Sequence, residues 1–295
     1  MDNFARRLKS GKFIVTTELN PPKGTNIKPL LEKAKRLKGI VDAFNLTDSH
    51  RARMAMSPMA MAHRLILQNQ CPILQITCRD RNRLAIQSDL LGAFDLGISN
   101  LLCMTGDHPS SGDHPEAKPV FDVDAIKLLG IISSLNSGKD MSGRNLDGEP
   151  EFFSGAVVNP GALELEKEIR RMEAKVEAGA TFFQTQPVYE PDLFQEFIDR
   201  VSKFKVPIIC GIITLTSARM ATNLNRNLTG VSIPKAVIAE LDKSVDTEST
   251  SVAIAARVIK LIRPMCQGVH IMSLGREDLI PSILEKAEIA VSGET

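Results

Sequence analysis

The sequence has few of the features that mark several common classes of protein. It contains no tryptophan, one tyrosine and 12 phenylalanines, which leaves few aromatic rings for stacking against nucleic-acid bases. Its 36 Lys and Arg residues are balanced by 35 Asp and Glu residues, for a formal net charge of +1. No global charge therefore favours nucleic acid or an anionic membrane as a partner, and any anion binding must be local.

Long apolar runs and targeting signals are also missing. No apolar stretch approaches the roughly 20 residues that a membrane-spanning helix needs, and residues 1–7 lack the core of a signal peptide, so we expect a cytoplasmic protein. The five cysteines form no Cys-x-x-Cys pair, which favours free thiols in a reducing compartment. The P-loop, nucleophile-elbow and strand-linked Gly-x-Gly-x-x-Gly motifs are absent too.

What the sequence does contain is a regular alternation of short apolar runs with helical patterns. Such runs are typical of parallel strands buried on both faces. The predicted strands lie at residues 13–19, 41–46, 72–78, 100–104, 155–159, 180–186, 206–212 and 268–273. Eight strand–helix units predict an α/β fold, a single (β/α)8 TIM barrel over residues 1–295, with extra helices before the last strand.

Two helices carry more specific signals. Thr25 or Asn26 is expected to cap the helix after the first strand. The helix after the third strand is expected to be amphipathic, with Leu84, Leu91 and Phe94 on its apolar face.

Polar residues follow most of the predicted strands. Active sites of such barrels lie at the carboxyl ends of the strands, so these residues predict the site. Most are uncharged hydrogen-bonding side chains, which suit a planar heteroaromatic ligand better than a hydrolytic metal centre. They are Glu18, Thr47, Asp48, Thr77, Thr105, Gly106, Asp107, Asn159, Thr185, Gln186, Thr214 and Ser273.

Glu18 is the best candidate for acid–base chemistry. It ends an apolar strand and is soon followed by Pro21 and Pro22, a rigid turn. Loss of solvation there would raise its pKa and allow it to deliver a proton near neutral pH. The alternative is that Glu18 caps a neighbouring helix or pairs with a lysine.

Two other groups allow more than one interpretation. Asp107-His108 and Asp113-His114 resemble a metal site, but a solvated loop around one functional aspartate fits a Gly- and Ser-rich segment better, so no metal is predicted. Glu168, Arg171 and Lys175 share one helical face. They form either a surface ion-pair row or a ridge that grips the ribityl and phosphate parts of a cofactor.

The same residues resemble a known family, the methylenetetrahydrofolate reductases, from about Phe13 to Arg276. Residues 18–22 (Glu-Leu-Asn-Pro-Pro) are similar to the family's Glu-Phe-x-Pro-Pro, and Thr-Gly-Asp at 105–107 is similar to its Arg-Gly-Asp. Further similar segments are Ile-Thr-Cys-Arg-Asp at 76–80, Lys-Val-Glu-Ala-Gly-Ala with Thr-Gln at 175–186, and Gly-Val-His with Leu-Gly-Arg at 268–276.

The resemblance implies an eight-stranded barrel that carries a flavin. Hydride would pass from the flavin N5 to the one-carbon bridge of 5,10-methylenetetrahydrofolate, giving 5-methyltetrahydrofolate for methionine synthesis or a methyl branch of C1 fixation. Glu18 would be the acid, and the charge of Asp107 would favour the cationic intermediate. Gln186 would contact the pterin edge and Arg276 the folate tail.

The resemblance also implies the cofactor contacts. FAD is the default flavin, with FMN allowed by altered phosphate-side residues, and an oligomer is expected. The implied contact positions are Thr47, Asp48, Gln75, Thr105, Gly106, Asp107, Phe121, Asn159, Glu168, Arg171 and Lys175.

Departures from the family pattern cluster near the cofactor and its electron donor. Thr105 stands in place of Arg, Gln75 in place of His, and Ala218 in place of a stacking Phe, while residues 159–162 lack a family His. The donor is therefore NAD(P)H or a partner subunit. Two other functions stay open: a folate-dependent methyltransferase or demethylase of the same fold, and a subunit of an electron-transfer complex.

Overall fold

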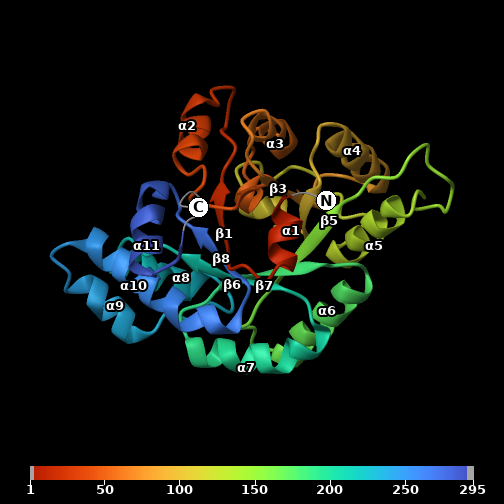
Figure 1. Cartoon of the computed structure of the whole chain (residues 1–295). Helices are drawn as coiled ribbons and strands as arrows, with labels where there is room; N and C mark the ends of the chain where they lie inside the picture. Colours follow the sequence, from red (N-terminus) through yellow and green to blue (C-terminus); the bar gives the residue numbers. More distant parts are fainter. Residues whose placement is uncertain (1–2, 291–295) are drawn as a thin grey trace.

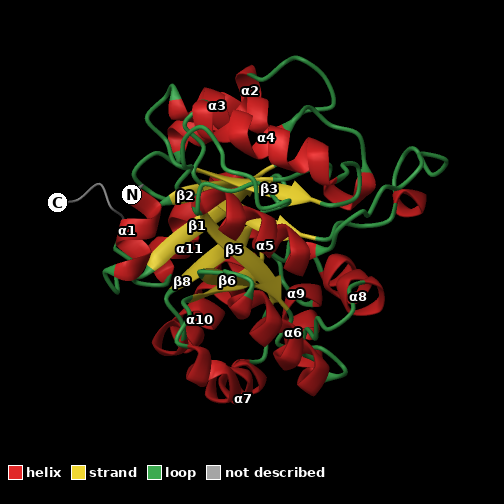
Figure 2. Ribbon diagram, turned by 90° about the vertical axis from the view of Figure 1, so that its right-hand side faces the viewer, coloured by secondary structure: helices red, strands yellow, loops and turns green. Residues whose placement is uncertain are grey.

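Eight parallel strands in chain order close into a barrel in the computed structural model, which describes residues 3–290. Helices surround the strands on the outside (Figures 1 and 2). The predicted (β/α)8 barrel is confirmed. The strands are β1 (Ile14–Leu19), β2 (Ala43–Leu46), β3 (Pro72–Thr77), β4 (Asn100–Met104), β5 (Phe153–Val158), β6 (Phe182–Pro187), β7 (Ile208–Ile213) and β8 (Gly268–Met272).

The α-helices lie before, between and after these strands, and three of them lie between β7 and β8, in agreement with the predicted extra helices before the last strand. None of the described helices is both long enough and apolar enough to cross a membrane. The helices are α1 (Asn3–Lys9), α2 (Lys28–Arg36), α3 (Pro58–Ile66), α4 (Arg83–Asp95), α5 (Ala125–Asn136), α6 (Leu165–Glu177), α7 (Pro191–Val201), α8 (Ala218–Asn227), α9 (Lys235–Asp242), α10 (Thr247–Ile262) and α11 (Ile280–Lys286).

Helix α1 closes the amino-terminal end of the barrel. Phe4 is fully buried and meets the rings of Phe153 and Phe182 edge-on, with centroids 6.0 and 5.4 Å away. Burial of aromatic surface and the edge-to-face geometry both stabilise this layer. Since this end is filled by side chains, the opposite rim is the end that remains for a ligand.

The expected apolar face of α4 is wrong. Leu84, Leu91 and Phe94 are exposed, whereas Ile86 and Leu90 are fully buried against the barrel. This helix carries apolar residues around much of its circumference, so their spacing does not determine which face turns inward. The predicted cap of α2 is wrong as well, because that helix begins at Lys28 without a side-chain cap.

A layer of polar side chains crosses the barrel interior above the apolar end. The Thr16 hydroxyl lies 2.8 Å from His270 Nδ1, and Asn45 Nδ2 donates to Gln184 Oε1 at 2.7 Å. Gln184 Nε2 donates to Asn45 Oδ1 at 3.2 Å and to Thr16 at 3.4 Å, which joins the four residues. Burial lowers the pKa of His270 to about 3, so the imidazole is neutral at physiological pH.

Candidate functional site at the carboxyl rim of the barrel

Glu18 lies at the rim, two residues beyond Thr16 on the inward face of β1. Burial raises the pKa of its carboxyl to about 7, and a hydrogen bond from Gln75 of β3 lowers that pKa. The expected upward shift is therefore confirmed. Among the described residues its side chain neither caps a helix nor pairs with a lysine, so the alternative interpretation is wrong.

Asp48, in contrast, is already engaged by protein groups. Its Oδ2 accepts from the Thr77 amide at 2.9 Å, the Thr77 hydroxyl at 2.8 Å and Arg81 Nη1 at 2.8 Å. The carboxylate is 5% exposed. These bonds tie the end of β2 to the end of β3, so Asp48 shapes the rim rather than offering a free acceptor. Gln75 and Thr47 lie on the inward face of these strands.

The segment Thr105–Asp107 forms a tight turn after β4. Gly106 has φ of +91°, and a Cβ at this position would lie 2.9 Å from Thr77 Cβ. Glycine is therefore needed here for conformation and for space. The Thr105 hydroxyl accepts from the Ala125 amide at 3.3 Å, at the start of α5. Asp107 is exposed. Burial and the nearby Arg51 lower the pKa of His50 across the rim, and the charge of Asp107 opposes this decrease.

The loop that follows is held in place by Asp113. Asp113 accepts from the Met54 amide at 2.9 Å and from Lys23 Nζ at 2.5 Å, and these bonds lower its pKa to about 2. His108 lies against the ring of Phe121, 6.2 Å between centroids. No group of three potential metal ligands occurs within residues 3–290.

The residues of α6 support the end of β5. Glu168 Oε1 accepts from the Asn159 amide at 3.1 Å, and Lys175 Nζ donates to the Val157 carbonyl at 2.6 Å. Lys175 is 4% exposed and burial lowers its pKa, so the surface ion-pair interpretation is wrong. Arg171, next to them on the helix, is exposed.

The side chains of Gln186 and Arg276 differ in whether protein groups already bind them. The side chain of Gln186 is half-buried at the end of β6 and forms no hydrogen bond within the described part of the chain. Arg276 Nη2 lies 2.6 Å from Glu248 and 2.9 Å from Asp278. The Arg276 guanidinium is thus opposed by two carboxylates, whereas the amide of Gln186 is open to a ligand.

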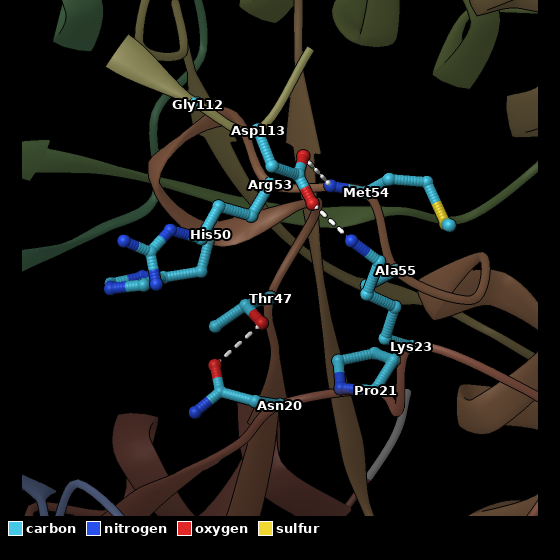
Figure 3. Close-up of a pocket in the computed structure, with 10 residues that line it drawn as sticks. All are labelled: Asn20, Pro21, Lys23, Thr47, His50, Arg53, Met54, Ala55, Gly112 and Asp113. Atoms are coloured by element: carbon cyan, nitrogen blue, oxygen red, sulfur yellow. Dashed lines mark hydrogen bonds and ion pairs between the residues drawn. The ribbon is translucent and has the colours of Figure 1, made fainter.

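A cleft of about 450 Å³ opens above β1 and β2 (Figure 3). At its floor the Thr47 hydroxyl donates to Asn20 Oδ1 at 2.8 Å. Thr47 is the single predicted site residue that lines it. The lining, which we call the Lys23–Arg53 cleft, consists of Asn20, Pro21, Lys23, Thr47, His50, Arg53, Met54, Ala55, Gly112 and Asp113.

The cleft and the interior polar layer were not predicted from the sequence. A usable signal for the polar layer existed, because inward-facing residues recur every second position along a strand. Asn45 and Gln184 stand two residues before the rim residues Thr47 and Gln186. Counting back two residues along the strand from each rim residue therefore locates this layer.

Comparison with known proteins finds similar sequences along nearly the whole chain. A family model described as methylenetetrahydrofolate reductase matches residues 3–288. Methylenetetrahydrofolate reductase 2 of Schizosaccharomyces pombe is 25% identical over 300 residues, covering 95% of this chain and 46% of that protein. Methylenetetrahydrofolate reductase (NADH) 1 of Zea mays is 24% identical over 291 residues, covering 95% and 48%. The chain spans about half the length of these curated relatives.

Solved structures share the fold. A Clostridium thermocellum protein, described as binding two copies of 5-methyl-5,6,7,8-tetrahydrofolic acid, aligns with a TM-score of 0.63 at 15% identity, covering 96% of this chain and 98% of that one. A tryptophan synthase chain from M. tuberculosis aligns at 0.54 and 11% identity, covering 97% of each chain. At these identities the likeness concerns the barrel alone.

Proposed function

The chain belongs to the methylenetetrahydrofolate reductase family, and from this we propose that it reduces 5,10-methylenetetrahydrofolate to 5-methyltetrahydrofolate with a bound flavin. The observation that carries the proposal is Glu18, whose carboxyl has a pKa raised to about 7 at the inward rim of the barrel. Such a group still holds its proton near neutral pH and can release it to a substrate nitrogen.

The reaction needs that proton. The one-carbon bridge joins N5 and N10 of the folate, and a proton delivered by Glu18 to N10 lets the bond from the bridge carbon to N10 break. The electron pair of that bond remains on N10, and the bridge becomes an iminium cation at N5. Addition of a hydride to this carbon gives the N5-methyl group, and the hydride donor is oxidised by two electrons.

Other rim residues would bind and orient the substrate. The open amide of Gln186 can pair with the donor and acceptor edge of a pterin. Asp107 carries a charge on the exposed side of the rim, which would stabilise positive charge developing on the substrate. That the C. thermocellum protein is described as binding 5-methyl-5,6,7,8-tetrahydrofolic acid supports folate as a ligand for a barrel of this kind.

The rim also fits a flavin. Uncharged groups of Thr47, Gln75 and Asn159 suit the polar edge of a heteroaromatic ring, and exposed Arg171 suits an anionic phosphate. Gly106 keeps the turn after β4 free of a side chain. When bound, FAD, or FMN in its place, would supply the hydride.

Several finer predictions belong to this proposal. The electron donor is NAD(P)H or a partner subunit. Both kinds of donor should be tested, because Ala218 stands where the family has a stacking Phe. An oligomeric, cytoplasmic enzyme serving methionine synthesis or C1 fixation is proposed on the resemblance.

Anaerobic spectroscopy tests the function directly. The purified chain should be yellow or should bind added FAD or FMN. After reduction with dithionite, mixing with 5,10-methylenetetrahydrofolate should restore the oxidised flavin spectrum and form 5-methyltetrahydrofolate. A protein that binds no flavin would contradict the proposal. A methyltransferase would leave the flavin reduced, and turnover of the isolated chain with an artificial donor would exclude a non-catalytic subunit.

A further inference from the structure

Helix α4 presents an apolar face to solvent on the outer wall of the barrel (Figures 1 and 2). Leu84, Leu91 and Phe94 are 75%, 40% and 37% exposed. No other described helix carries more than one exposed large apolar side chain. Single exposed apolar residues are normal on a protein surface, whereas a contiguous group marks an interaction surface. Leu84, Ser88 and Leu91 follow helical spacing, so they share one side of α4.

The segment between α5 and β5 extends this face. It projects from the barrel in Figure 1 and contains an antiparallel bridge between Lys139 and Asn145. The Met141 amide donates to Gln87 Oε1 of α4 at 2.8 Å, and Met141 is 36% exposed. The combined surface, which we call the α4 surface, consists of Leu84, Gln87, Ser88, Leu91, Phe94 and Met141.

The charged groups of α4 stand at the two ends of this surface. Arg83 begins the helix and binds Asp122 through Nε and Nη2, both at 2.8 Å, so Nη1 takes part in neither bond. Asp95 ends the helix, is exposed and forms no ion pair with a described residue. Asp89 turns aside to Arg81. The α4 surface is therefore apolar along its length, with a guanidinium at one end and a carboxylate at the other.

Asp95 also stands at the unfavourable end of its own helix. The helix macrodipole favours anions at the amino end and cations at the carboxyl end. However, α4 has no acidic residue in its first turn and no basic residue in its last turn. A neighbouring helix that runs the opposite way can supply both charges.

A second copy of α4, packed antiparallel, supplies them. In a twofold interface each residue contact occurs twice, once from each copy. Around an axis near Ser88, Leu84 lies against the partner's Leu91, and Arg83 lies within one turn of the partner's Asp95. The carboxylate of Asp95 thereby reaches the amino end of the partner's helix. A parallel copy would instead bring like charges together at both ends.

The extent of the surface is consistent with this arrangement. Stable interfaces bury roughly 600–1,000 Å² on each partner. Helix α4 has 13 residues and is roughly 20 Å long, so one helix face supplies part of that area and the Met141 segment adds to it. Since α4 covers the outside of the barrel, such an interface leaves the carboxyl rim around Glu18 open.

We propose that the α4 surface binds a second copy of this chain, with the two α4 helices antiparallel about a twofold axis. Burial of Leu84, Leu91, Phe94 and Met141 supplies the affinity. The pairs of Arg83 with Asp95 at the two ends determine the orientation. The inference goes beyond the proposed function, which concerns the rim alone.

Sedimentation velocity of the full chain tests the surface. The wild type should sediment as a dimer. Leu91→Glu should raise the dissociation constant at least about a hundredfold, because the twofold axis places a carboxylate from each copy in an apolar contact. Leu261→Glu, which changes a comparably exposed leucine on α10, should keep the wild-type constant. Circular dichroism would verify that both variants are folded.

Cysteine crosslinking tests the orientation. Leu84→Cys and Leu91→Cys should each form little intermolecular disulfide alone, whereas a mixture of the two variants should form linked dimers under mild oxidation. A mixture of Leu84→Cys with Leu261→Cys is the control. Four native cysteines are buried and Cys71 is half-buried, so the wild type should stay unlinked.

Each other result would overturn the inference. A monomeric wild type would exclude a second copy as the occupant of the α4 surface. A dimer that Leu91→Glu leaves intact would place the interface elsewhere, and crosslinking within each variant but not in the mixture would show a parallel pair. These measurements need no folate, so a failed reductase assay would refute the proposed function without affecting the dimer.

Discussion

The carboxyl of Glu18 on β1 accepts a hydrogen bond from the side chain of Gln75 on β3, across the end of β2. The two effects on Glu18 oppose each other, because burial raises its pKa and the Gln75 amide lowers it by stabilising the carboxylate. The balance is a pKa of about 7. An acid with this pKa is half protonated at neutral pH, as general acid catalysis near neutral pH requires.

Glu18→Gln should therefore separate reduction of the flavin by its donor from reoxidation of the flavin by the folate. The variant should bind flavin and accept electrons from a donor at the wild-type rate, because the substitution leaves the shape of the rim unchanged. Reoxidation by 5,10-methylenetetrahydrofolate should slow by at least about a hundredfold, the usual size of a lost proton transfer. Stopped-flow absorbance would measure both steps. Glu32→Gln, on the exposed face of α2, is the control, and normal reoxidation in Glu18→Gln would refute the acid assignment.

Gln75→Met should shift the pH dependence of flavin reoxidation by 5,10-methylenetetrahydrofolate. The wild-type rate should fall as pH rises through about 7, because the deprotonated carboxylate cannot donate. Removing the Gln75 amide removes the interaction that lowers the pKa of Glu18, so the midpoint should shift to higher pH. Flavin-saturated enzyme would be assayed from pH 5.5 to 9. Gln195→Met, whose amide donates to Asp199 on α7, should keep the wild-type midpoint. A downward shift in Gln75→Met would contradict the geometry.

Glu18 should also reduce stability at high pH. Its folded pKa is raised above the unfolded value, so the folded state binds the proton more tightly and loses stability as pH rises from about 4.5 through 7. Glu18→Gln removes this effect. At pH 8 we expect the variant to be more stable than the wild type by about 1–2 kcal/mol, after allowance for partial exposure, and at pH 4.5 the two should be equal. Urea unfolding at both pH values measures the difference.

His270 should contribute the opposite pH dependence. Its pKa falls to about 3 in the folded protein, so the unfolded chain binds the proton more tightly. Stability from the neutral imidazole is present above about pH 6.5 and is lost as pH decreases toward 3. In His270→Leu the free energy of unfolding should decline less steeply between pH 6.5 and 4.5, by up to about 1.4 kcal/mol per pH unit. Exposed His114→Leu should keep the wild-type slope, and an unchanged slope in His270→Leu would show that this histidine does not govern acid unfolding.

The barrel could be predicted because each strand is a short apolar run followed by a polar stop. The same pattern predicted Glu18, Asp107 and Gln186 at one rim, since the carboxyl ends of parallel strands meet there. It could not predict the inner face of α4, whose apolar residues surround the helix. It could place Asn45 and Gln184 on the inward face but could not pair them, since a polar residue within a strand gives no sign of its partner across the barrel.

The Lys23–Arg53 cleft was beyond sequence reasoning for another reason. It exists because Asp113, far along the chain, bonds to Lys23 and to the Met54 amide. Contacts of this kind between loops leave no periodic pattern in the sequence. They depend on the conformations of three loops that lie far apart in the sequence.

Two glycines offer a final test, one in the turn after β4 and one within α4, and their substitutions should have opposite effects on stability. Gly106→Ala places a Cβ 2.9 Å from Thr77 Cβ at a φ of +91°, and we expect a loss of about 1–3 kcal/mol of stability. Gly92→Ala lies within α4 with nothing within 4 Å, so it should gain about 0.5–1 kcal/mol from better helix propensity.

Flavin binding should also differ between Gly106→Ala and Gly92→Ala. Gly106 lies between Thr105 and Asp107, so a shift of the backbone in Gly106→Ala should displace both residues and weaken flavin binding. Fluorescence titration would measure the flavin affinity at a temperature where both variants are folded. Gly92→Ala should bind flavin as the wild type does. Equal flavin affinity in the two variants would mean that the turn supports the fold alone and that the cofactor lies away from β4.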